Sequence, residues 1–129
     1  FGKVVYGGNL GWKEVAWGGT EYYGVKIGDS PFKDKFNKPI LSWVPSIGVG
    51  QIGFYKGRTF NEWNGDLLCT GAKYGLLIRL DYKNKKILKK EVLIKDKIGR
   101  IRDFEIDKNG DIFIIVDDKD ASLWKLSKK

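Results

Sequence analysis

The sequence contains no histidine and a single cysteine, Cys69, among its 129 residues. Without histidine the chain lacks the commonest general base and the commonest metal ligand, so it holds no complete histidine-dependent site of its own. Cys69 has no disulfide partner within the chain. Because it lies in the apolar run Leu67-Leu68-Cys69, we interpret it as a small buried hydrophobic residue rather than a nucleophile.

Long apolar runs are also missing. No stretch reaches the length needed to cross a bilayer, so we expect no membrane span. No signal peptide is visible either, and the first residues, Phe1-Gly2-Lys3-Val4, read as the inside of a strand. The length is sufficient for one domain with a hydrophobic core.

Positive charge is in excess, with 24 Lys and Arg against 16 Asp and Glu and a formal net charge of +8. Such an excess permits binding to nucleic acid, anionic lipid or an acidic ligand. The lysines are densest between Lys83 and Lys97, where alternate lysines also protect an outer strand from edge pairing. Aromatic residues do not interleave with this run as base stacking requires, so we predict no nucleic-acid partner.

The second half of the chain has the pattern of short β-strands. Its apolar segments are rich in β-branched and aromatic residues and are separated by turn residues such as Asn84 and Asn109-Gly110. No segment shows a sustained helical period with caps, so we predict an all-β fold. The predicted strands are Gln51–Tyr55, Asp66–Gly71, Leu76–Tyr82, Ile87–Ile94, Ile101–Ile106, Asp111–Val116 and Ser122–Leu126.

An internal repeat organises these strands. Asn64-Gly65-Asp66 and Asn109-Gly110-Asp111 each open a strand, and they lie about 45 residues apart, the length of one four-stranded β-propeller blade. We therefore predict part of a single β-propeller domain of antiparallel sheets, with one blade over 51–97 and a last blade over 98–129. The last blade lacks its closing strand, which the N-terminus of a full chain supplies in a closed propeller.

The first 50 residues are rich in glycine and aromatic residues and follow no regular period. We predict long loops carried over a sheet face, and long ordered loops are usually functional. The alternative for Trp12, Trp17 and Trp43 is that each only caps the core.

The segment Gly99-Arg100-Ile101-Arg102-Asp103 carries the clearest functional signal. Alternation along a strand places Arg100 and Arg102 on the same side, so both guanidinium groups point at one place and predict an anion site. The alternative is a solvated basic edge, because charged residues commonly blunt strand edges.

A succession of motifs follows in order along nearly the whole chain. They are Gly8-Asn9-Leu10-Gly11-Trp12, Glu21-Tyr22-Tyr23-Gly24, Trp43-Val44-Pro45-Ser46-Ile47, Phe54-Tyr55-Lys56-Gly57, Trp63-Asn64-Gly65-Asp66-Leu67-Leu68 and Gly99-Arg100-Ile101-Arg102-Asp103. In this order they resemble the C-terminal half of the soluble quinoprotein glucose/sorbosone dehydrogenase family. These proteins are six-bladed propellers that oxidise aldose sugars with pyrroloquinoline quinone (PQQ) and calcium. Leu10 and Lys13 replace a tyrosine and a proline of the family pattern, so we expect a differently shaped loop there.

The resemblance implies a set of cofactor-binding residues. The family's two quinone-contacting arginines correspond to Arg100 and Arg102, and its cofactor lysine corresponds to Lys73, for which the alternative is a solvated turn lysine. Ser46 is similar in position to a residue that donates a hydrogen bond to the cofactor, and Trp43 to a wall of the sugar pocket. PQQ carries three carboxylates and adjacent carbonyls, which guanidinium groups bind well and stabilise on reduction.

The resemblance also implies what this chain lacks. The family's catalytic histidine, an arginine-asparagine pair and the carbonyls that hold calcium all precede the equivalent of Phe1. That histidine removes a proton from the anomeric hydroxyl while hydride passes to the quinone. We therefore expect no catalytic and no metal-ligating residue here, and an inactive chain unless it is joined to the rest of a protein about two to three times longer.

The resemblance further implies a periplasmic or secreted parent protein with a sugar substrate and an external electron acceptor. Open sheet edges predict oligomerisation or association with the missing N-terminal half. The alternative function is a non-catalytic β-propeller that binds a protein or carbohydrate partner, since fold alone does not secure activity. Lys73, Arg100 and Arg102 together favour the quinone hypothesis.

Overall fold

The computed structural model describes residues 1–16, 23–28 and 33–128. The chain divides into two compact units, Phe1–Pro45 and Ser46–Lys129. No helix in these described ranges has both the length and the apolar character needed to span a membrane.

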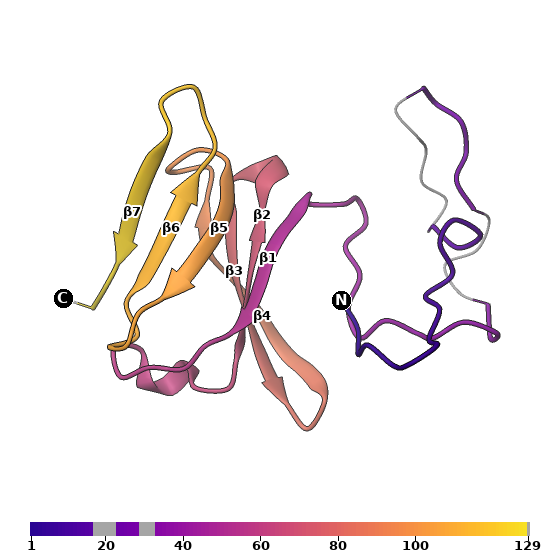
Figure 1. Cartoon of the computed structure of the whole chain (residues 1–129), viewed down its shortest axis with the longest axis horizontal. Helices are drawn as coiled ribbons and strands as arrows, with labels where there is room; N and C mark the ends of the chain where they lie inside the picture. The colour runs from indigo at the N-terminus through magenta and orange to yellow at the C-terminus, as the bar shows by residue number, and fades with distance from the viewer. Residues whose placement is uncertain (17–22, 29–32, 129) are drawn as a thin grey trace. The chain divides into compact units, whose positions relative to one another are not determined.

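The second unit consists of two antiparallel sheets (Figure 1). The first sheet has four strands in the order β1-β2-β3-β4, and the second has three in the order β5-β6-β7, so each sheet is a simple meander. The elements are β1 (Val49–Phe54), the 3₁₀ helix η1 (Asn61–Trp63), β2 (Leu67–Gly71), the 3₁₀ helix η2 (Ala72–Tyr74), β3 (Leu76–Lys83), β4 (Lys86–Lys95), β5 (Ile101–Ile106), β6 (Ile112–Val116) and β7 (Ser122–Leu126). The seven strands predicted between residues 51 and 126 are all present, and their bounds agree to within about two residues. The strand expected at Phe1–Val4 is wrong, because these residues have no regular secondary structure.

Local turn chemistry explains why the strands fold back on one another. Asn84 and Lys85 both have positive φ angles, 51° and 62°, as the tight turn between β3 and β4 requires. Gly110 has a φ of 99° and follows Asn109 at the start of β6. Its amide and two neighbouring amides donate to the carboxylate of Asp107, which fixes the turn between β5 and β6.

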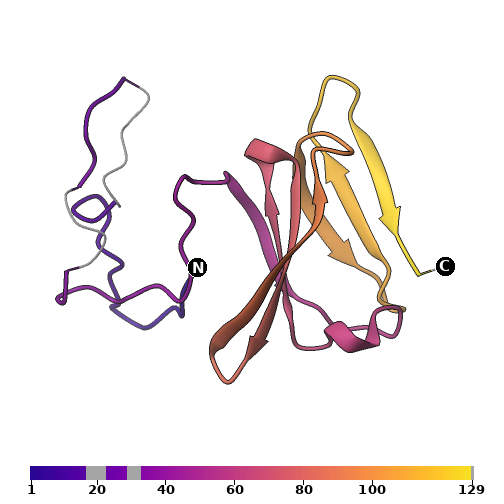
Figure 2. The same cartoon turned by 180° about the vertical axis from the view of Figure 1, so that it is seen from behind.

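The core lies between the two sheets, which face each other in Figure 1 and, from behind, in Figure 2. Alternate residues of β6 point into it together with Ile101 and Phe104 of β5, and β2 and β3 contribute from the other side. The buried cluster consists of Tyr55, Phe60, Leu68, Leu77, Ile101, Phe104, Ile112, Ile114 and Val116.

Tyr55 joins the two sheets at one end of this core. Its side chain is 1% exposed, and its hydroxyl donates to the carbonyl of Gly110 over 2.7 Å and accepts from the amide of Phe60 over 3.0 Å. Nearby, the amides of Arg58 and Thr59 both donate to the carbonyl of Asn109. These bonds fix the chain before η1 against the second Asn-Gly turn.

Each copy of the internal repeat contains an ion pair at the equivalent position. Asp66 pairs with Arg79 at 2.7 Å in the first sheet, and Asp111 pairs with Lys125 at 2.6 Å in the second. Both carboxylates follow an Asn-Gly turn, and both cations lie on the third strand of their sheet. The repeated sequence pattern therefore places the same kind of bond at equivalent positions.

The first unit is irregular, as its composition predicts. Its described residues contain no α-helix and no strand beyond an isolated bridge at Lys26. Its termini are tied together, since the amino group of Phe1 donates to the carbonyl of Leu41. Trp12 is exposed, which does not fit a core-capping role for it, whereas Trp17 lies outside the described residues.

Candidate cofactor site

Four of the five residues that the sequence singles out belong to the second unit: Ser46, Lys73, Arg100 and Arg102. They lie on segments at one end of the two sheets, where β1 begins, β2 runs into η2 and β5 begins (Figure 1). The fifth residue, Trp43, belongs to the first unit, where it is partly buried. Its buried indole Nε1 has no hydrogen-bond partner within the described ranges.

Backbone hydrogen bonds hold Ser46 and Lys73 on adjoining segments. The amide of Lys73 donates to the carbonyl of Ile47 over 3.0 Å, and the amide of Ala72 donates to the carbonyl of Gly48 over 2.8 Å. The Ser46 hydroxyl oxygen accepts from the amide of Gly48 over 3.2 Å. Lys73 and Ser46 are both exposed, and the ammonium of Lys73 lies 5.2 Å from the centre of the Tyr74 ring.

The turn that carries Lys73 also packs against the segment that precedes Arg100. Gly75 has a φ of 53°, and a Cβ there would collide with the carbonyl oxygen of Gly99, so both the conformation and the space require glycine. The amide of Asp96 donates to the carbonyl of Gly75. This contact brings the Lys73 turn of the first sheet beside the start of β5 in the second sheet.

Thr70 fixes the backbone of Arg102. The Thr70 side chain is fully buried, and its hydroxyl donates to the carbonyl of Arg102 over 3.1 Å while accepting from the amide of Gln51 over 2.8 Å. The backbone of Gly50 lies directly against the same carbonyl. The hydroxyl of Thr70 in β2 therefore links β1 and β5 at the backbone of Arg102.

The two arginines flank the fully buried Ile101 and are themselves about half exposed, at 52% and 48%. Their side chains approach one carboxylate: Nε of Arg102 lies 2.7 Å and Nε of Arg100 lies 4.0 Å from Oδ2 of Asp117. The hydrogen bond from Arg102 lowers the pKa of Asp117 below its ordinary value. Both arginines thus approach the same oxygen, which belongs to a carboxylate of this chain, while their binding of an external anion stays a prediction.

Asp117 is not among the site residues that the sequence predicts. The signal lies in the strand register. Ile101 pairs with Val116 across β5 and β6, and the amide of Asp117 donates to the carbonyl of Arg100. Asp117 follows the last residue of β6 and Arg100 precedes the first residue of β5, so the two must lie side by side. This neighbour relation can be deduced as soon as the β5-β6 hairpin is assigned.

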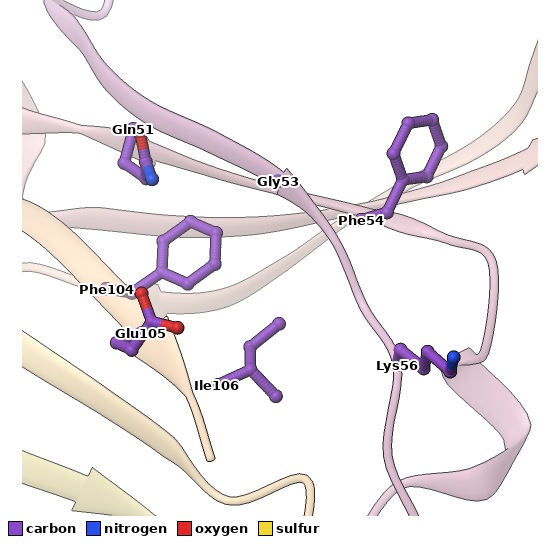
Figure 3. A pocket seen from close by; sticks show the side chains of 7 residues that line it. All are labelled: Gln51, Gly53, Phe54, Lys56, Phe104, Glu105 and Ile106. Atoms are coloured by element: carbon purple, nitrogen blue, oxygen red, sulfur yellow. The ribbon is translucent and has the colours of Figure 1, made fainter. Parts of the chain in front are cut away.

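A separate hollow of about 260 Å³ lies between the edge strands β1 and β5 (Figure 3). The ring of Phe104 contacts Gly53, where a Cβ would stand 3.4 Å from it. None of the predicted site residues lines this hollow, whose walls are Gln51, Gly53, Phe54, Lys56, Phe104, Glu105 and Ile106.

The described residues offer no cluster of metal-ligating side chains and no exposed thiol. Within the described ranges, no three His, Cys, Asp or Glu side chains come close enough together to hold a metal ion. Cys69 is fully buried in β2, and burial raises the pKa of its thiol to about 11. This burial confirms the interpretation of Cys69 as a core residue.

The two antiparallel meander sheets define the class of the fold, which is part of a β-propeller. The sequence profile of the Glucose / Sorbosone dehydrogenase family matches residues 2–125. The chain therefore belongs to the glucose/sorbosone dehydrogenase family, which confirms the predicted resemblance and the predicted fold class, an all-β partial propeller.

Individual relatives agree. The aldose sugar dehydrogenase YliI of Escherichia coli (strain K12) is 26% identical over 125 residues, which cover 95% of this chain and 33% of that protein. A crystal structure of a glucose dehydrogenase is 27% identical, with a TM-score of 0.84 over 95% of this chain and 36% of its own. The apo-form of the soluble aldose sugar dehydrogenase of Escherichia coli is 25% identical with a TM-score of 0.82 over 95% of this chain. The chain spans about a third of the length of these relatives.

Proposed function

We propose that this chain forms the C-terminal part of a PQQ-dependent aldose sugar dehydrogenase and supplies cations that bind the quinone cofactor. The single observation that carries the proposal is the gathering of Lys73, Arg100 and Arg102 at one end of two packed sheets. Membership of a sugar dehydrogenase family supports it. The donor set fits the group, because PQQ presents three carboxylates and guanidinium groups bind carboxylates through paired N–H donors.

Each residue has a distinct part in this proposal. Arg100 and Arg102 bind carboxylate or carbonyl oxygens of the cofactor and oppose the negative charge that reduction places there. Lys73 adds a point charge from the neighbouring turn, and the hydroxyl of Ser46 donates a hydrogen bond. Trp43 forms a wall of the sugar pocket. When bound, PQQ supplies the two-electron acceptor for oxidation of the anomeric carbon of the sugar.

The remaining parts of the reaction lie outside this chain in our proposal. The catalytic base and the ligands of the cofactor's calcium are supplied by a preceding part of the protein, so this chain alone is inactive. Within the described strands, β7 pairs on one side only, with β6, and its other edge is available for the closing strand of the last blade. The parent protein is periplasmic or secreted and passes electrons to an external acceptor.

The experiment is a titration of PQQ, with calcium, into the longest polypeptide that contains this chain. The comparison variants are Arg100→Ala and Arg102→Ala, with Lys119→Ala as an exposed cation control on the β6-β7 turn. We expect saturable binding that both arginine variants weaken and the control retains, with dye reduction on adding an aldose. Absence of binding by the folded wild-type protein would favour the non-catalytic propeller that binds a partner.

A further inference from the structure

Asp117 lies in the candidate site with no role in the family-based assignment above. Its carboxylate approaches Arg102 and Arg100 at Nε of each, over 2.7 Å and 4.0 Å. Within the described residues, no group accepts a hydrogen bond from the terminal Nη atoms of Arg102. An arginine offers five N–H donors in a fixed plane, so a partner at Nε still leaves the outer donors for a second anion.

We propose that Asp117 is a positioning residue, which holds the Nε edge of Arg102 so that the Nη donors face the anionic cofactor. The inference rests on the proposed function, since it requires that Arg102 bind PQQ. Asp117 is suited to this task because its own backbone is fixed: its amide donates to the carbonyl of Arg100. The Arg102 backbone is fixed too, through the buried hydroxyl of Thr70.

Two effects of the Asp117 carboxylate oppose each other. Its hydrogen bond orders a long, half-exposed side chain, which saves part of the entropy lost when the cofactor binds. Its negative charge weakens the attraction of the arginines for an anion. Asp117→Asn removes the charge and retains the acceptor oxygen, whereas Asp117→Ala removes both. The two variants therefore compare the presence and absence of the acceptor oxygen at the same net charge.

The test measures the PQQ dissociation constant by titration, with calcium, in the longest polypeptide that contains this chain. We expect Asp117→Ala to bind about 3- to 10-fold more weakly than Asp117→Asn, the range that one net hydrogen bond supports. In an Arg102→Ala background the difference between the two variants should disappear, because the hydrogen bond then has no donor. Melting temperatures of all variants establish that each one is folded.

Asp118 provides the matched control. It is the next carboxylate on the same loop, and it accepts a hydrogen bond from the amide of Lys119 rather than from either arginine. Asp118→Ala and Asp118→Asn should therefore bind PQQ equally. Equal binding by Asp117→Ala and Asp117→Asn, or a difference that persists without Arg102, would overturn the positioning role while leaving the proposed function in place. A folded wild-type protein that does not bind PQQ would overturn both.

Discussion

The ion pair between Asp66 and Arg79 is expected to carry a large share of the stability of the first sheet. The Asp66 side chain is 4% exposed and that of Arg79 is 20% exposed, so removing the arginine strands a buried carboxylate. The guanidinium also donates to Glu91 over 3.1 Å and lies 5.2 Å from the centre of the Trp63 ring. Arg79→Leu therefore removes the main counter-charge of Asp66.

Breaking a buried ion pair by removing one partner costs about 3–5 kcal/mol. We expect the lower end, about 3 kcal/mol, because Arg79 keeps some contact with water and Asp66 still accepts from the amide of Tyr82 over 3.4 Å. Adding Asp66→Asn to Arg79→Leu removes the stranded charge and should restore much of the lost stability.

The internal repeat supplies the control. Lys125 is the cation at the equivalent position of the second sheet, but its side chain is 50% exposed. Lys125→Leu should therefore cost far less than Arg79→Leu. The assay is urea unfolding of the longest polypeptide that contains this chain, followed by tryptophan fluorescence. If both variants lower the free energy of unfolding equally, the burial argument is wrong.

Three further predictions concern single groups. Tyr55→Phe should lower the free energy of unfolding by about 1–3 kcal/mol, measured by urea unfolding, because two buried backbone groups lose their partner. Cys69 should not react with an aromatic disulfide reagent at pH 8 until the protein unfolds, since burial raises its pKa to about 11; rapid labelling of folded protein would contradict this. The pKa of Asp117, measured by carboxyl ¹³C NMR, should lie below 3.8, and Arg102→Ala should raise it toward that value. The stability that this ion pair contributes is therefore present at neutral pH and lost only as the pH falls through the lowered pKa.

Most of the β structure could be predicted from the sequence because its signals are local. Runs of β-branched residues mark the strands, and Asn84 and the Asn-Gly turns mark the reversals, so even the order within each sheet follows. The 3₁₀ helices η1 and η2 were not predicted. Each is three residues long, too short to show a period.

For the candidate site, the sequence predicts the residue types and their alternation along one strand, but not which segments of the other sheet lie beside them. Arg100 and Arg102 flank a buried residue, as a strand requires, although the β5-β6 register shifts between Ile101 and Asp103. The Lys73 turn comes beside Arg100 through a contact between Gly75 and Gly99, which belong to different sheets. Such a contact depends on how the sheets pack, and no local pattern encodes it.

The same packing links the candidate site to the core. Ile101 is fully buried among residues of both sheets, and it lies between the two arginines in the chain. Its side chain therefore fixes the backbone from which both guanidinium groups extend, while Thr70 fixes the carbonyl of Arg102 from the other sheet. A shift of one sheet against the other must change the spacing of Lys73 and the arginines, whereas a change at Arg79 acts within one sheet. Under the proposed function, the affinity for an anionic cofactor should therefore depend on the residues that hold the two sheets together as well as on those that touch the cofactor.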